Sequence, residues 1–78
     1  MEIKVLGTGC PSCLTLEYTT KQAVQELGLN ALVIKVEDMM EIINHNVMRT
    51  PALVINGKVV SAGKKLSLQE VKELLTKN

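Results

Sequence analysis

Aromatic residues are nearly absent from this sequence of 78 residues, which has no tryptophan, no phenylalanine and a single tyrosine, Tyr18. Proteins that bind single-stranded nucleic acid stack bases on exposed aromatic rings, so the composition argues against that function. An excess of one charge is also lacking, because nine basic residues stand against eight acidic ones. The longest basic run, Lys64-Lys65, is expected in a solvated turn. A near-neutral chain predicts neither a nucleic-acid nor a membrane partner.

Long apolar runs are missing as well. No segment approaches the roughly 20 apolar residues that a membrane-spanning helix needs. The first four residues, Met1-Glu2-Ile3-Lys4, lead directly into a strand-like pattern with no apolar leader before it. We therefore expect a cytoplasmic protein. The length suits one domain, residues 1–78, with an aliphatic core, and we expect it to be a monomer.

Cysteine is scarce too, with only Cys10 and Cys13 in the chain. Two cysteines cannot form the disulfide framework of a small secreted domain, and a permanent bridge is not expected in a reducing compartment. The pair must therefore be redox-active, metal-binding or incidental.

Hydropathy patterning predicts seven elements in the order β-α-β-α-β-β-α. Strands are expected at residues 2–6, 31–36, 52–55 and 58–61, and helices at 10–27, 37–43 and from 67 nearly to the end. A strand–helix–strand unit gives a right-handed parallel pair, and a hairpin adds two antiparallel strands. The expected fold class is α/β, with one four-stranded mixed sheet and helices on both faces. The continuous apolar run at 31–36 predicts a strand covered on both sides.

Local signals support these elements. In the first helix, the expected core stripe comprises Leu16, Thr20, Ala23 and Leu27, and Gly28 ends the helix. Asn56-Gly57 predicts a tight hairpin turn, and Ser67 with Glu70 forms a capping box for the last helix.

Apolar residues outside that stripe predict two further features. Leu14 and Tyr18 fall on the opposite face of the first helix, so we expect a partly exposed apolar pair there. Met39, Met40 and Met48 are interpreted as core filler rather than as soft-metal ligands.

The segment Cys10-Pro11-Ser12-Cys13 carries the predicted chemistry. Two cysteines three apart at a helix start can reach each other, and the small ring that they close adds little stability. The free N–H groups and the positive end of the helix dipole stabilise a thiolate, the form that attacks disulfides. At about 100° per residue, Cys13 projects near the core stripe while Cys10 lies towards solvent. Cys10 is therefore the predicted nucleophile and Cys13 the resolving thiol, with Pro11 and Ser12 tuning the potential.

The GTGCPSC opening, the Thr50-Pro51 step before a strand and the VINGK hairpin resemble a minimal thioredoxin or glutaredoxin. More narrowly, the chain resembles the small redox-active disulfide proteins of bacteria and archaea, over essentially its whole length. The resemblance implies a thioredoxin-like fold and a thiol–disulfide oxidoreductase that needs no organic cofactor or metal. The implied partners are a disulfide-containing protein or small molecule and an upstream reductase.

The resemblance also assigns a role to the Thr50-Pro51 step. It implies that Pro51 is in cis and that the Thr50 backbone offers hydrogen bonds to a substrate chain. Thioredoxins proper carry WCGPC and a buried acid in the first strand, and this chain has neither of them.

Two other functions stay open at this stage. A heavy-metal-binding module also places a CxxC between its first strand and helix, and two thiolates suit Cu(I) or Zn²⁺. Against that function stand Thr8 in a position usually occupied by methionine, the capped final helix and the Thr50-Pro51 step. His45 could add a third ligand, although a solvated turn is the simpler interpretation. A non-catalytic interaction domain, docking through Leu14 and Tyr18, is the third possibility.

Overall fold

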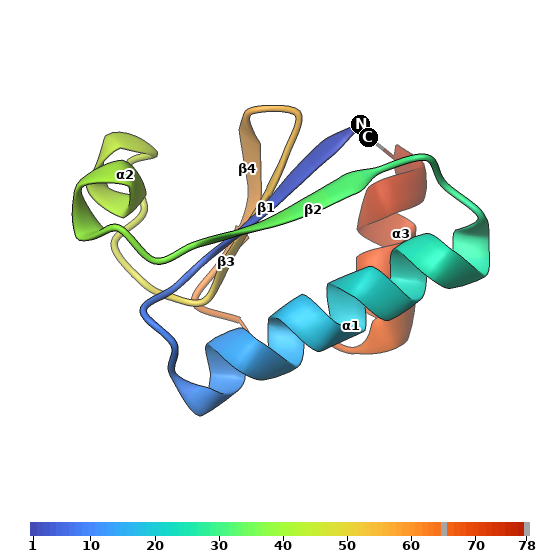
Figure 1. Cartoon of the computed structure of the whole chain (residues 1–78), viewed down its shortest axis with the longest axis horizontal. Helices are drawn as coiled ribbons and strands as arrows, with labels where there is room; N and C mark the ends of the chain where they lie inside the picture. Colours follow the sequence, from blue (N-terminus) through green and yellow to red (C-terminus); the bar gives the residue numbers. More distant parts are fainter. Residues whose placement is uncertain (65, 78) are drawn as a thin grey trace.

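The computed structural model describes residues 1–64 and 66–77, so the expected Lys64-Lys65 turn lies partly outside the described residues. Along the chain the elements are β1 (Glu2–Leu6), α1 (Pro11–Leu27), β2 (Leu32–Val36), α2 (Met39–Asn44), β3 (Ala52–Ile55), β4 (Lys58–Ala62) and α3 (Leu68–Lys77), as Figure 1 shows. The predicted order of elements is confirmed.

The four strands form one mixed sheet in the order β2-β1-β3-β4. β1 pairs in parallel with β2 and antiparallel with β3, and β3 pairs antiparallel with β4. The predicted α/β, thioredoxin-like architecture is therefore confirmed. β2 lies at an edge of the sheet, and Leu32 at its start is exposed. The predicted cover on both sides is confirmed in part, because Val33 packs against the cluster under α1 and α3 while Ile34 and Val36 join the cluster on the α2 face, and only Leu32 is exposed.

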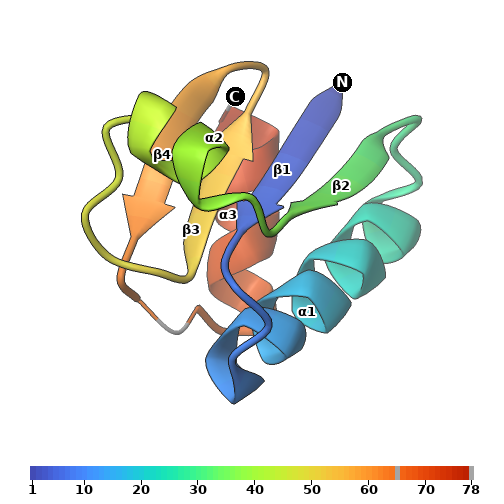
Figure 2. The ribbon, with the colours of Figure 1, turned by 60° about the vertical axis from the view of Figure 1, so that its left-hand side comes forward.

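Helices cover both faces of the sheet, as predicted. α1 and α3 pack on one face, while α2 lies on the other (Figure 2). The larger core lies between the sheet and the α1–α3 pair, and it contains Ile3, Val5, Leu16, Ala23, Leu53, Ile55, Leu66, Val71 and Leu75. Of the predicted stripe on α1, Leu16, Thr20 and Ala23 are buried and Leu27 is partly buried.

The cluster on the α2 face is smaller and comprises Leu6, Val36, Ile42, Val47, Ala52 and Val54. α2 has only six residues, and Ile42 is the one that it buries. Met39, Met40 and Met48 are all exposed, Met48 to 96 %. The prediction that these methionines fill the core was wrong. So short a helix turns only one side towards the sheet, which leaves Met39 and Met40 outside, and Met48 lies in the loop after α2.

The turn and cap signals in the second half of the chain are confirmed. Asn56 and Gly57 adopt φ angles of 50° and 83°, as a tight hairpin of this type requires. Ser67 Oγ accepts a hydrogen bond from the Glu70 N–H at 3.2 Å, and a Glu70 carboxylate oxygen accepts one from the Ser67 N–H at 3.0 Å. In the part of the chain that the structure describes, no helix is long and apolar enough to cross a membrane.

Candidate redox site

The site lies where three strands meet at one end of the sheet. Leu6 at the end of β1 pairs with Val36, the last residue of β2, and with Ala52, the first residue of β3. The N–H of Gly7 continues the ladder by donating to the Val36 carbonyl at 2.9 Å. The chain then needs only two further residues to reach Cys10. The central strand of the sheet therefore positions the start of α1.

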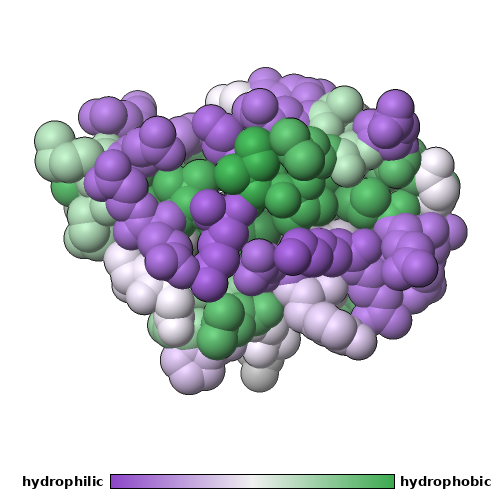
Figure 3. All heavy atoms as spheres, in the orientation of Figure 1, coloured by the Kyte–Doolittle hydropathy of each residue, from purple (hydrophilic) through white to green (hydrophobic). Residues whose placement is uncertain are grey.

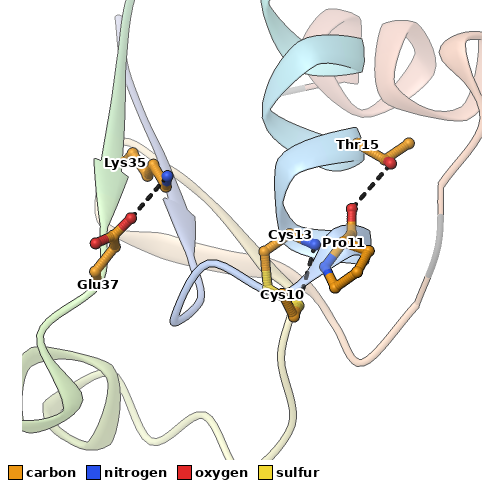
Figure 4. Close-up of a disulfide and its surroundings, with 6 residues drawn as sticks. All are labelled: Cys10, Pro11, Cys13, Thr15, Lys35 and Glu37. Atoms are coloured by element: carbon orange, nitrogen blue, oxygen red, sulfur yellow. Dashed lines mark hydrogen bonds and ion pairs between the residues drawn. A yellow bond between two sulfur atoms is a disulfide. The ribbon is translucent and has the colours of Figure 1, made fainter.

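Cys10 caps α1, and its side chain is joined to Cys13 in a disulfide (Figure 4). The two Cα atoms are 5.1 Å apart, within the normal range for a bridge. Cys10 Sγ accepts a hydrogen bond from the backbone N–H of Cys13 at 3.2 Å. Pro11 occupies the first turn, where a proline leaves no donor unsatisfied. The Cys13 N–H directed at Cys10 Sγ, together with the positive end of the helix dipole, favours negative charge on that sulfur.

The two sulfurs differ in their access to solvent. Cys13 is only 2 % exposed, whereas Cys10 is partly exposed. Gly7 covers Cys13 closely: a Cβ added at Gly7 would lie 2.8 Å from Cys13 Cβ and would overlap Cys13 Sγ. The backbone at Gly7, directly after β1, therefore covers the Cys13 side chain. Cys10 is therefore the more accessible of the two cysteines.

Thr50 and Pro51 lie at the same end of the sheet as the disulfide. The Thr50–Pro51 peptide bond is cis, as the resemblance implied. Pro51 is buried and Thr50 is exposed. Because Ala52 pairs with Leu6, the residues just before β3 lie beside those just after β1. The Thr50-Pro51 step and the CPSC segment therefore lie at the same end of the sheet, and contact between Thr50 and a substrate stays a prediction.

The structure adds an ion pair that the sequence analysis did not find. Lys35 Nζ lies 2.7 Å from Glu37 Oε1 at the end of β2, and Figure 4 shows this pair across the β1–α1 loop from the disulfide. The hydrogen bond to Glu37 is the main reason why the pKa of Lys35 is raised. A Cβ at Gly9 would lie 4.0 Å from that carboxylate oxygen, so the pair borders the loop that leads to Cys10. The signal was available, since residues two apart on a strand project to the same side.

The remaining predicted site residues are placed as follows. Ser12 is partly buried, and the hydrogen bond to sulfur within the described residues comes from the Cys13 N–H instead. Leu14 and Tyr18 are exposed to 48 % and 69 %, which confirms the predicted apolar pair on the outer face of α1. Redox tuning by Ser12 and Pro11 stays a prediction.

The donor set for the metal-binding alternative is small. Over residues 1–64 and 66–77, no group of three or more His, Cys, Asp and Glu side chains could hold a metal ion. His45 ends α2 instead, with its Nδ1 at 2.8 Å from the Glu41 carbonyl oxygen. Among the described residues, no histidine or carboxylate therefore joins the two cysteines in such a group.

Comparison with known proteins agrees with this geometry. A family model described as a thioredoxin domain matches residues 1–76. The chain belongs to the thioredoxin family. It is similar to a thioredoxin from Methanothermobacter thermautotrophicus, with 34% identity over 76 residues that cover 97% of this chain and 99% of the relative. It is also similar to a thioredoxin from Methanocaldococcus jannaschii, with 41% identity over 73 residues covering 94% and 84% of the two chains.

Membership of the thioredoxin family confirms the predicted class of activity, thiol–disulfide exchange by an oxidoreductase. Thioredoxins in general react with disulfide substrates and with reductases. The disulfide between Cys10 and Cys13 shows which two sulfurs of this chain can carry that chemistry.

Proposed function

We propose that this thioredoxin-family protein reduces disulfides through Cys10, with Cys13 as the resolving thiol. The observation that carries the assignment is the difference in exposure between the two sulfurs at the start of α1. Cys10 is partly exposed and caps the helix, whereas Cys13 is 2 % exposed and lies against Gly7. Only an accessible thiolate can attack a disulfide in another molecule.

The exchange proceeds in two steps. The Cys10 thiolate attacks one sulfur of the substrate disulfide, forms a mixed disulfide and displaces the other sulfur, which takes up a proton. The Cys13 thiol then loses its proton and attacks Cys10 Sγ, and the second substrate sulfur leaves as a thiol. The substrate has gained two electrons and two protons, and the protein holds the Cys10–Cys13 disulfide seen in the structure. A dithiol or an upstream reductase returns the protein to its reduced form.

The neighbouring residues support these steps. The Cys13 N–H, 3.2 Å from Cys10 Sγ, stabilises the Cys10 thiolate when the bridge is open. Pro11 stiffens the first turn, and Ser12 lies between the two cysteines, so both residues tune the potential. The exposed Thr50 and the buried Pro51 border the approach to Cys10 and contact the substrate chain. The physiological form is a cytoplasmic monomer that acts on a disulfide-containing protein.

The experiment that tests the roles is mixed-disulfide trapping. The Cys13→Ser variant, incubated with an excess of a disulfide-bonded peptide, accumulates a covalent adduct on Cys10 because no second thiol resolves it. The Cys10→Ser variant is the matched control and forms adduct at least about tenfold more slowly. Intact and peptide mass spectrometry read out both proteins, which suits a chain without tryptophan. Faster trapping on Cys13 in the control would reverse the two roles.

A further inference from the structure

The segment around the two cysteines carries no charge of its own. Residues 5–16 contain no aspartate, glutamate, lysine, arginine or histidine. The lower left of Figure 3, where Figure 1 places the start of α1, is accordingly mostly pale or green. The charges that a partner meets as it approaches Cys10 therefore come from the neighbouring strand ends. The strand order β2-β1-β3-β4 decides on which side of Cys10 each charge lies.

Two basic residues lie on the β4 side of this end of the sheet. Ala52, which begins β3, pairs with Ala62, which ends β4. The residues just before β3 and just after β4 therefore lie at the same end of the sheet as the disulfide. Arg49 precedes β3 by three residues and Lys64 follows β4 by two, and both are exposed.

The β2 side of the same end has the opposite character. Lys35 is paired with Glu37 at 2.7 Å, so the two together add no net charge. The next residue, Asp38, is exposed and caps α2 by accepting a hydrogen bond from the Met40 N–H at 3.0 Å. A partner at Cys10 therefore meets negative charge towards β2 and positive charge towards β4.

Arg49 is the better placed of the two basic residues to bind an anion. Lys64 shares the lining of a small cavity between β4 and α3 with Glu70, so a carboxylate already compensates part of its charge. Within residues 1–64 and 66–77, the Arg49 guanidinium has no hydrogen-bond or ion-pair partner. A guanidinium stays protonated, and its planar fork can donate two parallel hydrogen bonds to one carboxylate.

The stem of the Arg49 side chain is held against the end of β4. A Cβ added at Gly63 would lie 2.8 Å from Arg49 Cβ and 3.0 Å from Arg49 Cδ, so the stem passes directly over this glycine. Gly63 is itself fixed, because its N–H donates to the Pro51 carbonyl at 2.9 Å. These contacts connect Arg49 to the cis-proline step. They also reduce the conformational entropy that the side chain loses when it binds a ligand.

The spacing of the strands indicates how far a carboxylate on Arg49 lies from Cys10. β1 and β4 are two strand spacings apart, roughly 10 Å at about 4.8 Å for each spacing. An extended polypeptide advances about 3.3 Å per residue. When the reactive cysteine of a substrate is at Cys10, the residue about three positions away in the sequence can therefore reach Arg49.

We propose that Arg49 selects polypeptide disulfides that carry an acidic residue about three positions from the reactive cysteine. The proposal rests on the proposed function, and it adds the class of polypeptide that reacts fastest. The substrate carboxylate pairs with the Arg49 guanidinium while Cys10 attacks. Negative charge at Asp38 disfavours the reverse orientation, in which the acidic residue would lie towards β2.

The test compares two peptides that differ only in charge. Each carries its cysteine as a 2-thiopyridyl mixed disulfide, with glutamate three positions away on both sides in one peptide and glutamine in the other. The Cys10 thiolate attacks the peptide sulfur, and the absorbance of the released 2-thiopyridone gives the second-order rate constant. Rate constants with 2-mercaptoethanol correct for the intrinsic reactivity of each peptide. We expect the glutamate peptide to react about fivefold faster at low ionic strength, and less than about twofold faster in about 1 M salt.

Two charge variants locate the preference. Arg49→Gln removes the guanidinium, and the ratio of the two rate constants falls to about 1. Lys58→Gln is the matched control, because it also removes one exposed positive charge, but at the opposite end of β4. It keeps the ratio at about fivefold, because the charge is too far from Cys10 to act on the peptide. Circular dichroism verifies that both variants are folded.

Two glycine variants test whether the position of the guanidinium matters as well as its charge. Gly63→Ala forces the Arg49 stem away from β4, so the ratio falls below about twofold although no charge is removed. Gly57→Ala is the matched control: φ is 83° there and 71° at Gly63, but nothing lies within 4 Å of the added Cβ. It keeps the ratio of the unmodified protein. Equal ratios in the two glycine variants would overturn the fixed placement of Arg49.

The outcomes separate this inference from the proposed function. Equal rates for the two peptides in the unmodified protein overturn the role of Arg49 while leaving disulfide exchange intact. A preference that persists in Arg49→Gln also overturns it, because another cation then attracts the glutamates. A preference that Lys58→Gln loses as fully as Arg49→Gln overturns it too, because net charge then explains the effect. Failure of the reduced protein to react with either peptide overturns the proposed function itself.

Discussion

The two faces of the sheet differ in how completely they are covered. On one face, α1 and α3 together enclose a core that includes Leu16, Ala23, Leu53 and Val71, each at most 2 % exposed. On the other face, the six residues of α2 bury only Ile42 and leave Met39 and Met48 in solvent. The fold is therefore stabilised mainly from the first face. The second face leaves apolar side chains exposed around α2.

The contrast between the two faces is tested most strongly by removing a side chain from the enclosed core, where the largest loss of stability is expected. We expect Leu16→Ala to lower the free energy of unfolding by about 3 kcal/mol, because it leaves a cavity between α1 and the sheet. Urea denaturation followed by far-ultraviolet circular dichroism measures the change, since the chain has no tryptophan to report on unfolding. A loss below about 1 kcal/mol would show that the first face is not the main source of stability.

The junction between the sheet and the redox site is tested by Gly7→Ala. The added methyl group would overlap Cys13 Sγ, so the first turn of α1 must move away from β1. We expect the oxidised protein to lose about 2 kcal/mol of unfolding free energy, as overpacked interiors typically do. Gly57→Ala is not a suitable control because φ is positive there. Thr8→Ala, at an exposed position one residue further on, serves instead and changes stability by less than about 0.5 kcal/mol.

The capping box tests how firmly α3 closes the enclosed face. Ser67→Ala removes the oxygen that accepts from the Glu70 N–H. We expect a loss of about 1 kcal/mol in the free energy of unfolding, the usual cost of removing an N-cap. Ser67→Asp provides the control, because aspartate also caps helices well and should retain most of the stability. Equal losses in the two variants would mean that the cap hydrogen bond contributes little.

The contribution of the Ser67–Glu70 cap to stability depends on pH. Hydrogen bonding to Ser67 lowers the pKa of Glu70 below its ordinary value of 4.5. The folded state therefore favours the ionised Glu70 carboxylate. The resulting stabilisation is fully present above the pKa that Glu70 has in the unfolded chain, and it is lost as the pH falls through the lower pKa of the folded protein. We expect Glu70→Gln to show a shallower loss of stability than the unmodified protein between about pH 6 and about pH 3. Parallel curves from denaturation at each pH would contradict the assignment.

The smallest effect is expected on the open face. Met48→Ala removes a side chain that is 96 % exposed, so the free energy of unfolding should change by less than about 0.5 kcal/mol. Measured beside Leu16→Ala, it compares an aliphatic truncation on each face. A loss similar to that of Leu16→Ala would show that Met48 packs in solution, and the contrast between the faces would then be wrong.

Much of this fold was predictable because each signal acts locally. The helix over 11–27 follows from its apolar spacing and from Gly28, and the hairpin follows from Asn56-Gly57. Cys10 and Cys13 were identified as the reactive pair, and their difference in burial follows from the same helical spacing. The cis bond at Pro51 is a different case: an X-Pro step permits it, but the resemblance, rather than the local sequence, indicated it.

What could not be predicted depends on contacts between distant segments. Methionine is a residue type typical of a core, but Met39 and Met40 are exposed because α2 is short, and Met48 is exposed because it lies in the loop that follows α2. β2 has the composition of an interior strand, yet sheet order places it at an edge. Strand periodicity could have predicted that Lys35 and Glu37 project to the same side. Their position near the loop that leads to Cys10 could not be predicted, because it depends on β1 and β2 ending at the same point of the sheet.

The hydrogen bond from the Gly7 N–H to Val36 has a consequence for the catalytic cycle. This hydrogen bond holds the backbone at Gly7, one residue beyond β1, in the sheet. Forming and breaking the Cys10–Cys13 disulfide should therefore change the sheet little. Structural change between the two oxidation states should stay within the loop and the first turn of α1. When the oxidised and reduced proteins are compared by nuclear magnetic resonance, the amide signals of residues 8–14 should shift. The amide signals of the four strands should stay unchanged.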